Sequence, residues 1–250
     1  EMCDSDWSSD VCSSDLVTVA TADAGADVST AETRNGVAVG RHRGVAPGGA
    51  FHVAPGVVRS VRSVDADVVH AHNYHSLPLL FAALAVDDER FVATTHYHGA
   101  SASAVRDRLL TVYRTLGRRA LDRADAVVAV GDHERDLLRE DFGVDATVIP
   151  NGINVERFRG AAPRERDRPY LLTVGRLEEY KGVQHVVRAL PELPEYDLLV
   201  AGSGPYADDL RAAAAEAGVA DRVKLLGYVP DDELPGLYAG ADAYATMSSF

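Results

Sequence analysis

The loop GRLEEYKG, which runs from Gly175 to Gly182 after the apolar run YLLTV, places two cations beside two glycines. Arg176 and Lys181 come just before a predicted helix, and the glycines let the backbone approach a ligand closely. A guanidinium and an ammonium at a helix N-terminus suit a diphosphate, through charge-assisted hydrogen bonds and the helix dipole. The loop therefore indicates a diphosphate site. The alternative is an ordinary solvated loop in which Arg176 pairs with a neighbouring glutamate.

A second turn, formed by Gly202, Ser203 and Gly204, follows the next apolar run. Its amides are expected to face a phosphate ahead of the helix predicted over 206–217. The turn lacks the full GxGxxG pattern, and no GxxxxGK[ST] loop occurs in the sequence. On these residues alone, a turn that only caps the helix is the commoner explanation.

Five of the nine histidines lie between residues 70 and 98. His70 and His72 alternate along one predicted strand and so face the same way, as do His96 and His98 on the next strand. His75 lies on the turn between them. Two HxH pairs make a zinc site conceivable, but no nearby carboxylate or thiolate completes it. We expect hydrogen bonding to a polyhydroxylated substrate instead, with His70 as a satisfied core histidine.

The segment 102–123 is a predicted amphipathic helix, because its apolar residues recur with helical spacing. Its basic residues are Arg106, Arg108, Arg114, Arg118, Arg119 and Arg123. Such a helix on an acidic protein can rest on anionic lipid headgroups. The alternative, a solvated helix face on which Asp107 and Asp122 pair locally with arginines, is the more frequent case.

The composition describes an acidic globular protein. The 250 residues are 46% hydrophobic and 25% charged, enough for one large or two modest domains. With 25 basic and 38 acidic residues, the net charge of −13 argues against general binding of nucleic acid. No run approaches the roughly 18 apolar residues of a membrane-spanning helix. Two cysteines cannot form a disulfide framework.

Both cysteines lie in the Ser- and Asp-rich stretch 1–16, which has no helical or strand periodicity. Its part DWSSDVCSSDL resembles an in-frame translation of a sequencing-library adapter, and a natural disordered tail is the alternative. It is not a secretory signal, because it lacks a basic start and an apolar run. We expect this stretch to be non-native. Residues 17–250 then carry 33 acidic and 25 basic residues, a net charge of −8, and no cysteine.

From residue 17 onward, short apolar runs alternate with longer amphipathic stretches. Strands are predicted over 16–22, 36–40, 66–72, 91–97, 126–130, 146–150, 170–174, 196–202, 222–228 and 242–247. Helices are predicted over 76–86, 103–123, 132–141, 183–190, 206–217 and 231–240. Continuous apolar strands separated by helices indicate parallel sheets covered on both faces, in doubly wound α/β domains.

The change of domain is predicted after Pro150. The segment 151–169 carries turn residues and charge, and a new alternation of strands and helices follows it. We expect an N-terminal Rossmann-like domain over 17–150, a linker over 151–169 and a C-terminal Rossmann-like domain over 170–250. Ligands are expected at the carboxyl ends of the strands, facing a cleft between the domains.

Taken in order, the motifs resemble those of the GT-B glycosyltransferases, specifically glycosyltransferase family 4. The matching pieces are DVVHAHNYHS, VATTHYHG, ADAVVAVGDHERDLL, VIPNGINVERF, VGRLEEYKG, LLVAGSGPY and VKLLGYVPDDELPGLYAGADAYATMSSF. They run over nearly all of residues 17–250, and IPNGI followed by VGR and KG is the most specific combination.

The resemblance implies a cytoplasmic enzyme that transfers a sugar with retention and without a metal ion. A nucleotide-diphosphate sugar would be the co-substrate, with no other cofactor, and a lipid-linked or soluble sugar would be the acceptor. The helix over 102–123 would make any peripheral contact with an anionic membrane. The alternatives are a nucleotide-sugar epimerase of the same fold, which needs no acceptor, and a non-catalytic sugar-nucleotide binding protein.

The resemblance also implies roles for individual residues. Arg176 and Lys181 would hold the donor diphosphate and stabilise the charge that develops on the leaving group. His96 would lie where the sugar meets the acceptor. The donor phosphate pocket would be lined by Gly175, Gly202, Ser203 and Gly204, and the base would contact Tyr228 and Val229. The acceptor side would be formed by His72, His75 and His98. The hinge between the domains would be Asn151 and Gly152.

Two parts of the family pattern are missing. The opening strand and glycine-rich loop would precede Val17, and a Glu, seven residues and a second Glu would follow Phe250. Those carboxylates help bind the donor in the family. We therefore expect both domains to be incomplete in this chain and the chain by itself to be inactive.

Overall fold

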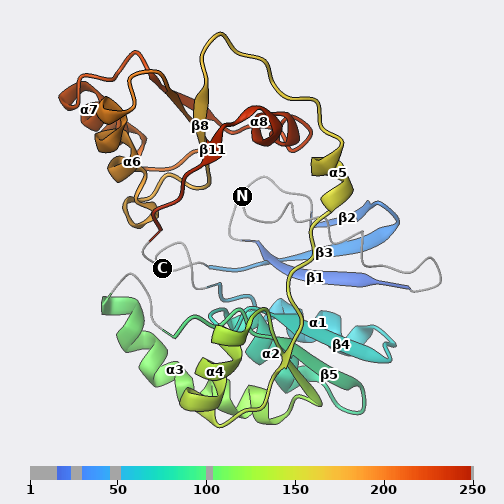
Figure 1. The fold of residues 1–250 in the computed structure, drawn as a ribbon. Helices are drawn as coiled ribbons and strands as arrows, with labels where there is room; N and C mark the ends of the chain where they lie inside the picture. Colours follow the sequence, from blue (N-terminus) through green and yellow to red (C-terminus); the bar gives the residue numbers. More distant parts are fainter. Residues whose placement is uncertain (1–15, 24–29, 46–51, 100–103, 249–250) are drawn as a thin grey trace. The chain divides into compact units, whose positions relative to one another are not determined.

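The computed structural model describes residues 16–23, 30–45, 52–99 and 104–248, and the side chains of 104–112 lie outside the description. The chain divides into two compact units, Glu1–Asn151 and Gly152–Phe250, here called unit 1 and unit 2 (Figure 1). This division falls one residue after Pro150. Apart from Leu16, the stretch predicted to be non-native lies outside the described residues.

The larger sheet of unit 1 is parallel, with the strand order β4-β5-β6-β7. Its strands are β4 (Val68–His72), β5 (Arg90–Thr94), β6 (Ala126–Ala129) and β7 (Thr147–Val148). The helices between them are α2 (Leu77–Ala85), α3 (Ala104–Asp122) and α4 (Asp132–Phe142). Phe91 and Ala93 of β5 pack in one buried cluster with Leu79 of α2 and Leu138 of α4. This part of the unit confirms the predicted parallel α/β architecture.

A second, three-stranded sheet in unit 1 has the order β1-β3-β2. β1 (Thr18–Asp23) pairs with β3 (Val37–Arg43) in parallel, and β2 (Ala31–Arg34) pairs with β3 antiparallel. The antiparallel pair corrects the expectation of an all-parallel unit. β2 was not predicted because each of its four residues is exposed and it has no apolar run.

Helix α1 (Gly56–Ser63) is a further element of unit 1 that sequence analysis missed. Its only fully buried residue is Val57, and its apolar residues are β-branched valines, which favour strands. The helix contacts both α2 and strands β1 and β3, so it joins the small sheet to the rest of unit 1.

Unit 2 holds a parallel sheet with the strand order β10-β9-β8-β11. The strands are β8 (Tyr170–Val174), β9 (Asp197–Ala201), β10 (Val223–Gly227) and β11 (Ala243–Tyr244). The helices are α5 (Val155–Arg159), α6 (Val183–Ala189), α7 (Ala207–Glu216) and α8 (Leu234–Gly240), with short 3-10 turns η3 (Glu179–Lys181) and η4 (Leu190–Glu192).

Strand β9 shows that the sheet of unit 2 is covered on both faces. Leu198 and Val200 pack in one buried cluster with residues of α6 and α7. Leu199 and Ala201 pack in another cluster, which includes Leu237 of α8. Alternate residues of a strand point to opposite faces of its sheet, so helices cover both faces of β9. This arrangement explains why the strand is apolar from Leu198 to Ala201 without a break.

Except for Asn151, the segment predicted as a linker, 151–169, belongs to unit 2. It contains α5, whose N-terminus is capped by the Asn154 side chain accepting from the amide of Arg157. Farther along, the Nε of Arg168 donates to Oδ1 of Asp197 at 3.0 Å. Asp197 is buried at the start of β9, so this ion pair holds the end of the segment against the sheet.

Candidate functional site

The structure joins the loop after β8 to the turn after β9 through backbone hydrogen bonds. The amide of Gly175 donates to the carbonyl of Ala201 at 2.9 Å, and the amide of Leu177 donates to the carbonyl of Ser203 at 2.9 Å. Both segments follow the carboxyl ends of neighbouring parallel strands. Two of the predicted donor-site segments are therefore brought together at the edge of the sheet where α/β domains bind ligands.

Arg176 and Lys181 both contact Tyr180 on this loop. The Nη2 of Arg176 donates to the Tyr180 hydroxyl at 2.9 Å, and the Nζ of Lys181 lies 5.2 Å from the centre of the same ring. In the described part of the chain neither cation pairs with a carboxylate, so the predicted alternative of an Arg176–glutamate pair does not occur. A pocket of about 20 Å³, lined by Arg176, Lys181 and Thr246 among others, lies beside them.

The turn at Gly202–Gly204 differs in part from the prediction. The amide of Gly202 donates to the carbonyl of Gly227 at 2.7 Å, so it is not free to face a phosphate. The amides of Ser203 and Gly204 have no acceptor among the described residues. They can therefore still donate hydrogen bonds to a phosphate. A Cβ at Gly204 would lie 2.3 Å from the carbonyl oxygen of Leu177, so this glycine permits close approach of the two loops.

Tyr228 and Val229 follow β10, the strand next to β9. The bond between Gly202 and Gly227 places them beside the glycine turn. Tyr228 is 71% exposed, whereas Val229 packs partly buried against a core cluster. The tyrosine ring is therefore available to stack on a planar ligand, and Val229 anchors the loop.

His72, at the end of β4, and His96, after β5, lie close together in unit 1. Their ring centres are 5.8 Å apart and their planes are inclined by 26°, and the ring centre of His70 lies 4.2 Å from that of His72. His70 is exposed, and its Nε2 is 2.8 Å from Oγ1 of Thr94. It is thus hydrogen-bonded as expected, but it does not belong to the core.

His75 and His98 form a second stack, with ring centres 4.1 Å apart. The predicted strand over 91–97 ends at Thr94, because His96 adopts the left-handed conformation with φ of 46°. His96 and His98 therefore do not alternate along a strand: His96 stacks on His72 at the end of β4, and His98 stacks on His75 of the following turn. The four histidines with predicted catalytic or acceptor roles therefore lie at the carboxyl ends of two neighbouring strands. His72 ends β4, His75 follows β4, and His96 and His98 follow β5.

Burial changes the protonation of two of these imidazoles. Burial lowers the pKa of His72 to about 4, with further contributions from His70 and His96. Burial also lowers the pKa of His75 to about 4, assisted by His98. Both rings are therefore uncharged at neutral pH, and each has one donor and one acceptor nitrogen. Across the described ranges, no group of three or more His, Cys, Asp or Glu is placed to hold a metal ion.

Glu134, on the first turn of α4, is a buried carboxylate that sequence analysis missed. It is 5% exposed and accepts hydrogen bonds from the Thr95 hydroxyl and from the amides of Tyr97 and Val130. The first two donors flank His96. The available signal was a Glu at the third position of a helix, where carboxylates commonly satisfy free amides of the N-terminus.

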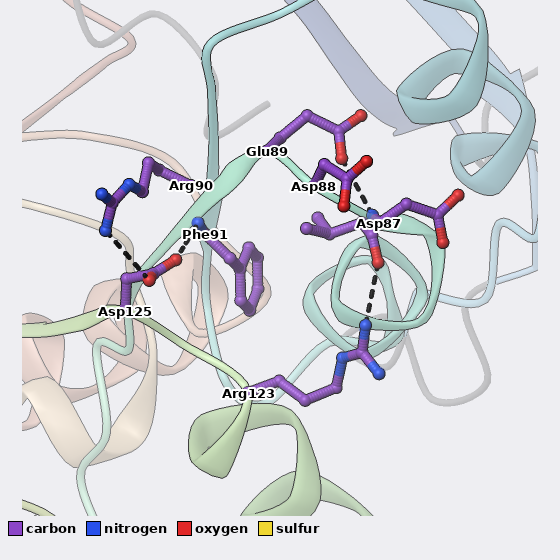
Figure 2. Close-up of a pocket in the computed structure, with 8 residues that line it drawn as sticks. Asp87, Asp88, Glu89, Arg90, Phe91, Arg123 and Asp125 are labelled. Carbon is purple, nitrogen blue, oxygen red and sulfur yellow. Dashed lines mark hydrogen bonds and ion pairs between the residues drawn. The ribbon is translucent and has the colours of Figure 1, made fainter.

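A larger pocket, of about 490 Å³, opens at the opposite edge of the sheet in unit 1 (Figure 2). It is lined by residues that precede or begin β5 and β6, including Asp87, Arg90 and Asp125. Asp125 accepts from the amide of Phe91 at 2.8 Å, and Arg123 donates to the carbonyl of Val86 at 2.8 Å. The side chains of Asp125 and Arg123 thus form hydrogen bonds within the protein. The pocket lies at the amino ends of parallel strands, where α/β sheets do not ordinarily bind ligands.

The predicted hinge residues lie at the division of the chain. Asn151 is the last residue of unit 1 and Gly152 the first residue of unit 2. Both are exposed, and a Cβ at Gly152 would meet nothing within 4 Å. The pair therefore has the freedom that a hinge needs, and its role as one stays a prediction.

Known proteins resemble the chain along both units. Residues 15–157 match Glycosyltransferase Family 4, and residues 154–250 match Glycosyl transferases group 1. The sucrose-phosphate synthase of Thermosynechococcus elongatus has a similar structure, with a TM-score of 0.72 at 20% identity over 91% of this chain and 64% of that one. The likeness supports the predicted GT-B fold.

Two mycobacterial enzymes are similar in sequence. The GDP-mannose-dependent alpha-(1-6)-phosphatidylinositol monomannoside mannosyltransferase of Mycolicibacterium smegmatis is 36% identical over 62% of this chain and 44% of its own length. The phosphatidyl-myo-inositol mannosyltransferase of Mycobacterium tuberculosis is 32% identical over 74% of this chain and 49% of its own length. The chain thus spans about half the length of these relatives. With more than half of its residues matched by the family, the chain belongs to Glycosyltransferase Family 4.

Proposed function

We propose that this protein is a retaining glycosyltransferase, which moves a sugar from a nucleotide-diphosphate sugar to a hydroxyl group of a sugar acceptor. The observation that carries the proposal is the pair of cations Arg176 and Lys181. They lie at the carboxyl end of β8, beside a glycine turn, without a carboxylate partner among the described residues. The proposal includes no metal ion and no cofactor besides the donor.

The chemistry assigns a different task to each group. The bond between the anomeric carbon and the diphosphate oxygen breaks, and the diphosphate leaves with the electron pair. Arg176 and Lys181 stabilise the negative charge that develops there, which is a large effect in such sites. The acceptor hydroxyl bonds to the anomeric carbon on the same face and passes its proton to the diphosphate oxygen that leaves. His96 is assigned to the sugar where it meets the acceptor, with His72, His75 and His98 on the acceptor side.

The names of the relatives suggest the first substrates to test. Both relatives are named as mannosyltransferases of phosphatidylinositol compounds, and one is named as dependent on GDP-mannose. We therefore propose GDP-mannose as the first donor and a phosphatidylinositol mannoside as the first acceptor. Soluble sugars form the second acceptor class.

Contact with an anionic membrane would use the exposed part of α3. None of the helices described is long and apolar enough to cross a bilayer. Arg118 and Arg119 are exposed beside the 44% exposed Leu116, although Arg118 pairs with Asp122 at 3.7 Å, as the alternative of local pairing predicted. Arg114 is engaged by Asp141 and the hydroxyl of Tyr97. The side chains of Arg106 and Arg108 lie outside the described residues. Neutralising Arg118 and Arg119 together should weaken binding to vesicles of anionic lipid, and unchanged binding would contradict the contact.

The central test is transfer of labelled sugar by the chain and by any longer form that its gene encodes. Donors would be GDP-mannose, UDP-glucose and ADP-glucose, each with a lipid-linked and a soluble acceptor. We expect one donor to give a product with the anomeric configuration of the donor, measured by proton NMR. Replacement of His96 by Ala should slow transfer much more than it weakens donor binding, and the melting temperature checks for a merely structural effect.

The alternative functions give different results in the same experiment. An epimerase would interconvert nucleotide sugars without an acceptor. A non-catalytic binding protein would bind the donor and turn over nothing with any acceptor. The two relatives described above are named as transferases, which favours transfer over both alternatives.

A further inference from the structure

The segment that carries His96 is fixed from both sides by one buried carboxylate. The hydroxyl of Thr95 and the amide of Tyr97, the latter at 2.6 Å, both donate to Oε1 of Glu134. Thr95 and Tyr97 are buried, whereas His96 between them is only partly buried. A single oxygen thus holds the residues before and after His96, and the imidazole between them stacks on His72.

The second oxygen of the same carboxylate ties this segment to the neighbouring strand. Oε2 of Glu134 accepts from the amide of Val130 at 2.7 Å, just after β6. The amide of Thr95 also donates to the carbonyl of Val128 at 3.1 Å. The first turn of α4 therefore connects the carboxyl ends of β5 and β6, and His96 lies at the point where they meet.

The backbone at His96 needs such support. Its φ of 46° is left-handed, a conformation that non-glycine residues adopt at a cost and keep only when surrounding contacts enforce it. The carboxylate supplies two such contacts, to the Thr95 hydroxyl and the Tyr97 amide, which would otherwise be buried without a partner. Without them the segment would be expected to relax, and the imidazole would move.

We propose that Glu134 is a positioning residue for transfer: it holds the backbone of residues 95–97 so that His96 presents its imidazole to the sugar. Glu134 acts through Thr95 and Tyr97 and does not contact substrate. The inference rests on the proposed function, because it assigns its effect to the role of His96. It does not require that the donor be GDP-mannose.

The substitution Glu134→Gln tests the inference with little change in shape. A carboxamide has one oxygen and one nitrogen, and the nitrogen cannot accept a hydrogen bond. The variant must therefore lose either the bonds to Thr95 and Tyr97 or the bond to Val130. Glu140→Gln is the matched control, because Glu140 lies on the same helix and is exposed. Thr95→Val removes only the hydroxyl bond, and Thr95→Ser should restore it.

The first readout is independent of activity. The ¹³Cα and ¹³Cβ shifts of His96, from histidine-labelled chain, report its backbone conformation. We expect them to move in Glu134→Gln and in Thr95→Val, and to stay in place in Glu140→Gln and Thr95→Ser. Unmoved shifts in both Glu134→Gln and Thr95→Val would overturn the inference. If Glu134→Gln does not fold, the Thr95 pair decides the question alone.

The second readout is the division between kcat and donor KM. A shift of a reacting group by about 1 Å can cost about 100-fold in rate. We expect kcat in Glu134→Gln to fall by about tenfold to 100-fold with donor KM nearly unchanged, and a fall in donor affinity alone would overturn the inference. If the parent transfers no sugar from any donor, the proposed function fails, while the shifts still show whether Glu134 holds His96.

Discussion

The guanidinium of Arg176 donates a hydrogen bond to the hydroxyl of Tyr180, 2.9 Å away and four residues later on the same loop. The ring of Tyr180 also faces the ammonium of Lys181 at 5.2 Å from its centre. One aromatic side chain therefore contacts both cations that we assign to the donor diphosphate. A carboxylate partner would neutralise these two cations. The phenol of Tyr180 instead orients them and leaves their positive charge available to a phosphate.

The substitution Tyr180→Phe should raise donor KM by about fivefold, because it removes the acceptor for Arg176 while keeping the ring beside Lys181. The fall in kcat should be smaller. Steady-state kinetics with varied donor measure both. Tyr196→Phe is the control, since Tyr196 lies before β9, away from the loop. Equal effects of the two substitutions would mean that the Arg176–Tyr180 bond does not matter for donor binding.

Removing either cation should have a larger effect. We expect Arg176→Ala and Lys181→Ala each to lower kcat/KM for the donor by about 100-fold or more, because the developing charge loses a donor in the transition state. Lys224→Ala is a matched control, because Lys224, the other lysine of the chain, is exposed on β10. Unchanged kinetics in the loop variants would remove these residues from the diphosphate site.

The parallel sheets and the donor loops were predictable from sequence because their signals are local and repeated. YLLTV and DLLVA are apolar at nearly every position, as strands covered on both faces must be, and a cationic or glycine-containing loop follows each. Because the strands are parallel and belong to one sheet, the loops that follow them lie at the same edge, the carboxyl edge. No further sequence signal is needed to predict this. The family and the GT-B fold follow from the same ordered motifs.

The β2–β3 hairpin was missed although its turn carries a recognisable signal. Asn35 and Gly36 have φ of 51° and 83°, the conformation that an Asn-Gly hairpin turn requires. The strand before it, AETR, is exposed throughout, so an analysis based on apolar runs passes over it. Here turn chemistry, not hydrophobicity, specifies the strand.

The roles of Gly202 and Glu134 could not be read from sequence because they depend on long-range contacts. The amide of Gly202 is occupied by a carbonyl 25 positions away in the chain, at Gly227. Glu134 meets Thr95 across 39 positions, and in sequence it is one charged residue of an amphipathic helix. Only the strand order shows which loops become neighbours.

Gly202 should tolerate no side chain. Its φ is 139°, and a Cβ built there would lie 1.9 Å from the carbonyl oxygen of Gly175. We expect Gly202→Ala to lower the free energy of unfolding by about 2 kcal/mol or more, measured by urea denaturation. The control is Gly160→Ala in the same unit, where the nearest atom would lie 3.8 Å away. Similar losses in both variants would contradict a close-packed donor loop.

The histidine cluster should make the stability of unit 1 depend on pH. Burial lowers the pKa of His72 and His75 to about 4, from an ordinary value of 6.5. The unfolded chain therefore binds protons at a higher pH than the folded chain does. The stabilising contribution is complete above about pH 6.5 and is lost as the pH falls to about 4, with a slope of at most about 1.4 kcal/mol per pH unit for each histidine.

His75→Phe isolates this effect from that of the carboxylates. Phenylalanine keeps an aromatic ring against Tyr97, which stacks on His75 at 5.4 Å, and it carries no titrating group. Urea denaturation of parent and variant between pH 7.5 and about 4 measures the difference in slope. The variant should lose less stability than the parent as the pH falls, so their unfolding free energies should diverge below about pH 6.5. Parallel curves would mean that the imidazole of His75 becomes protonated as readily in the folded chain as in the unfolded one, and that His75 is not held neutral by burial.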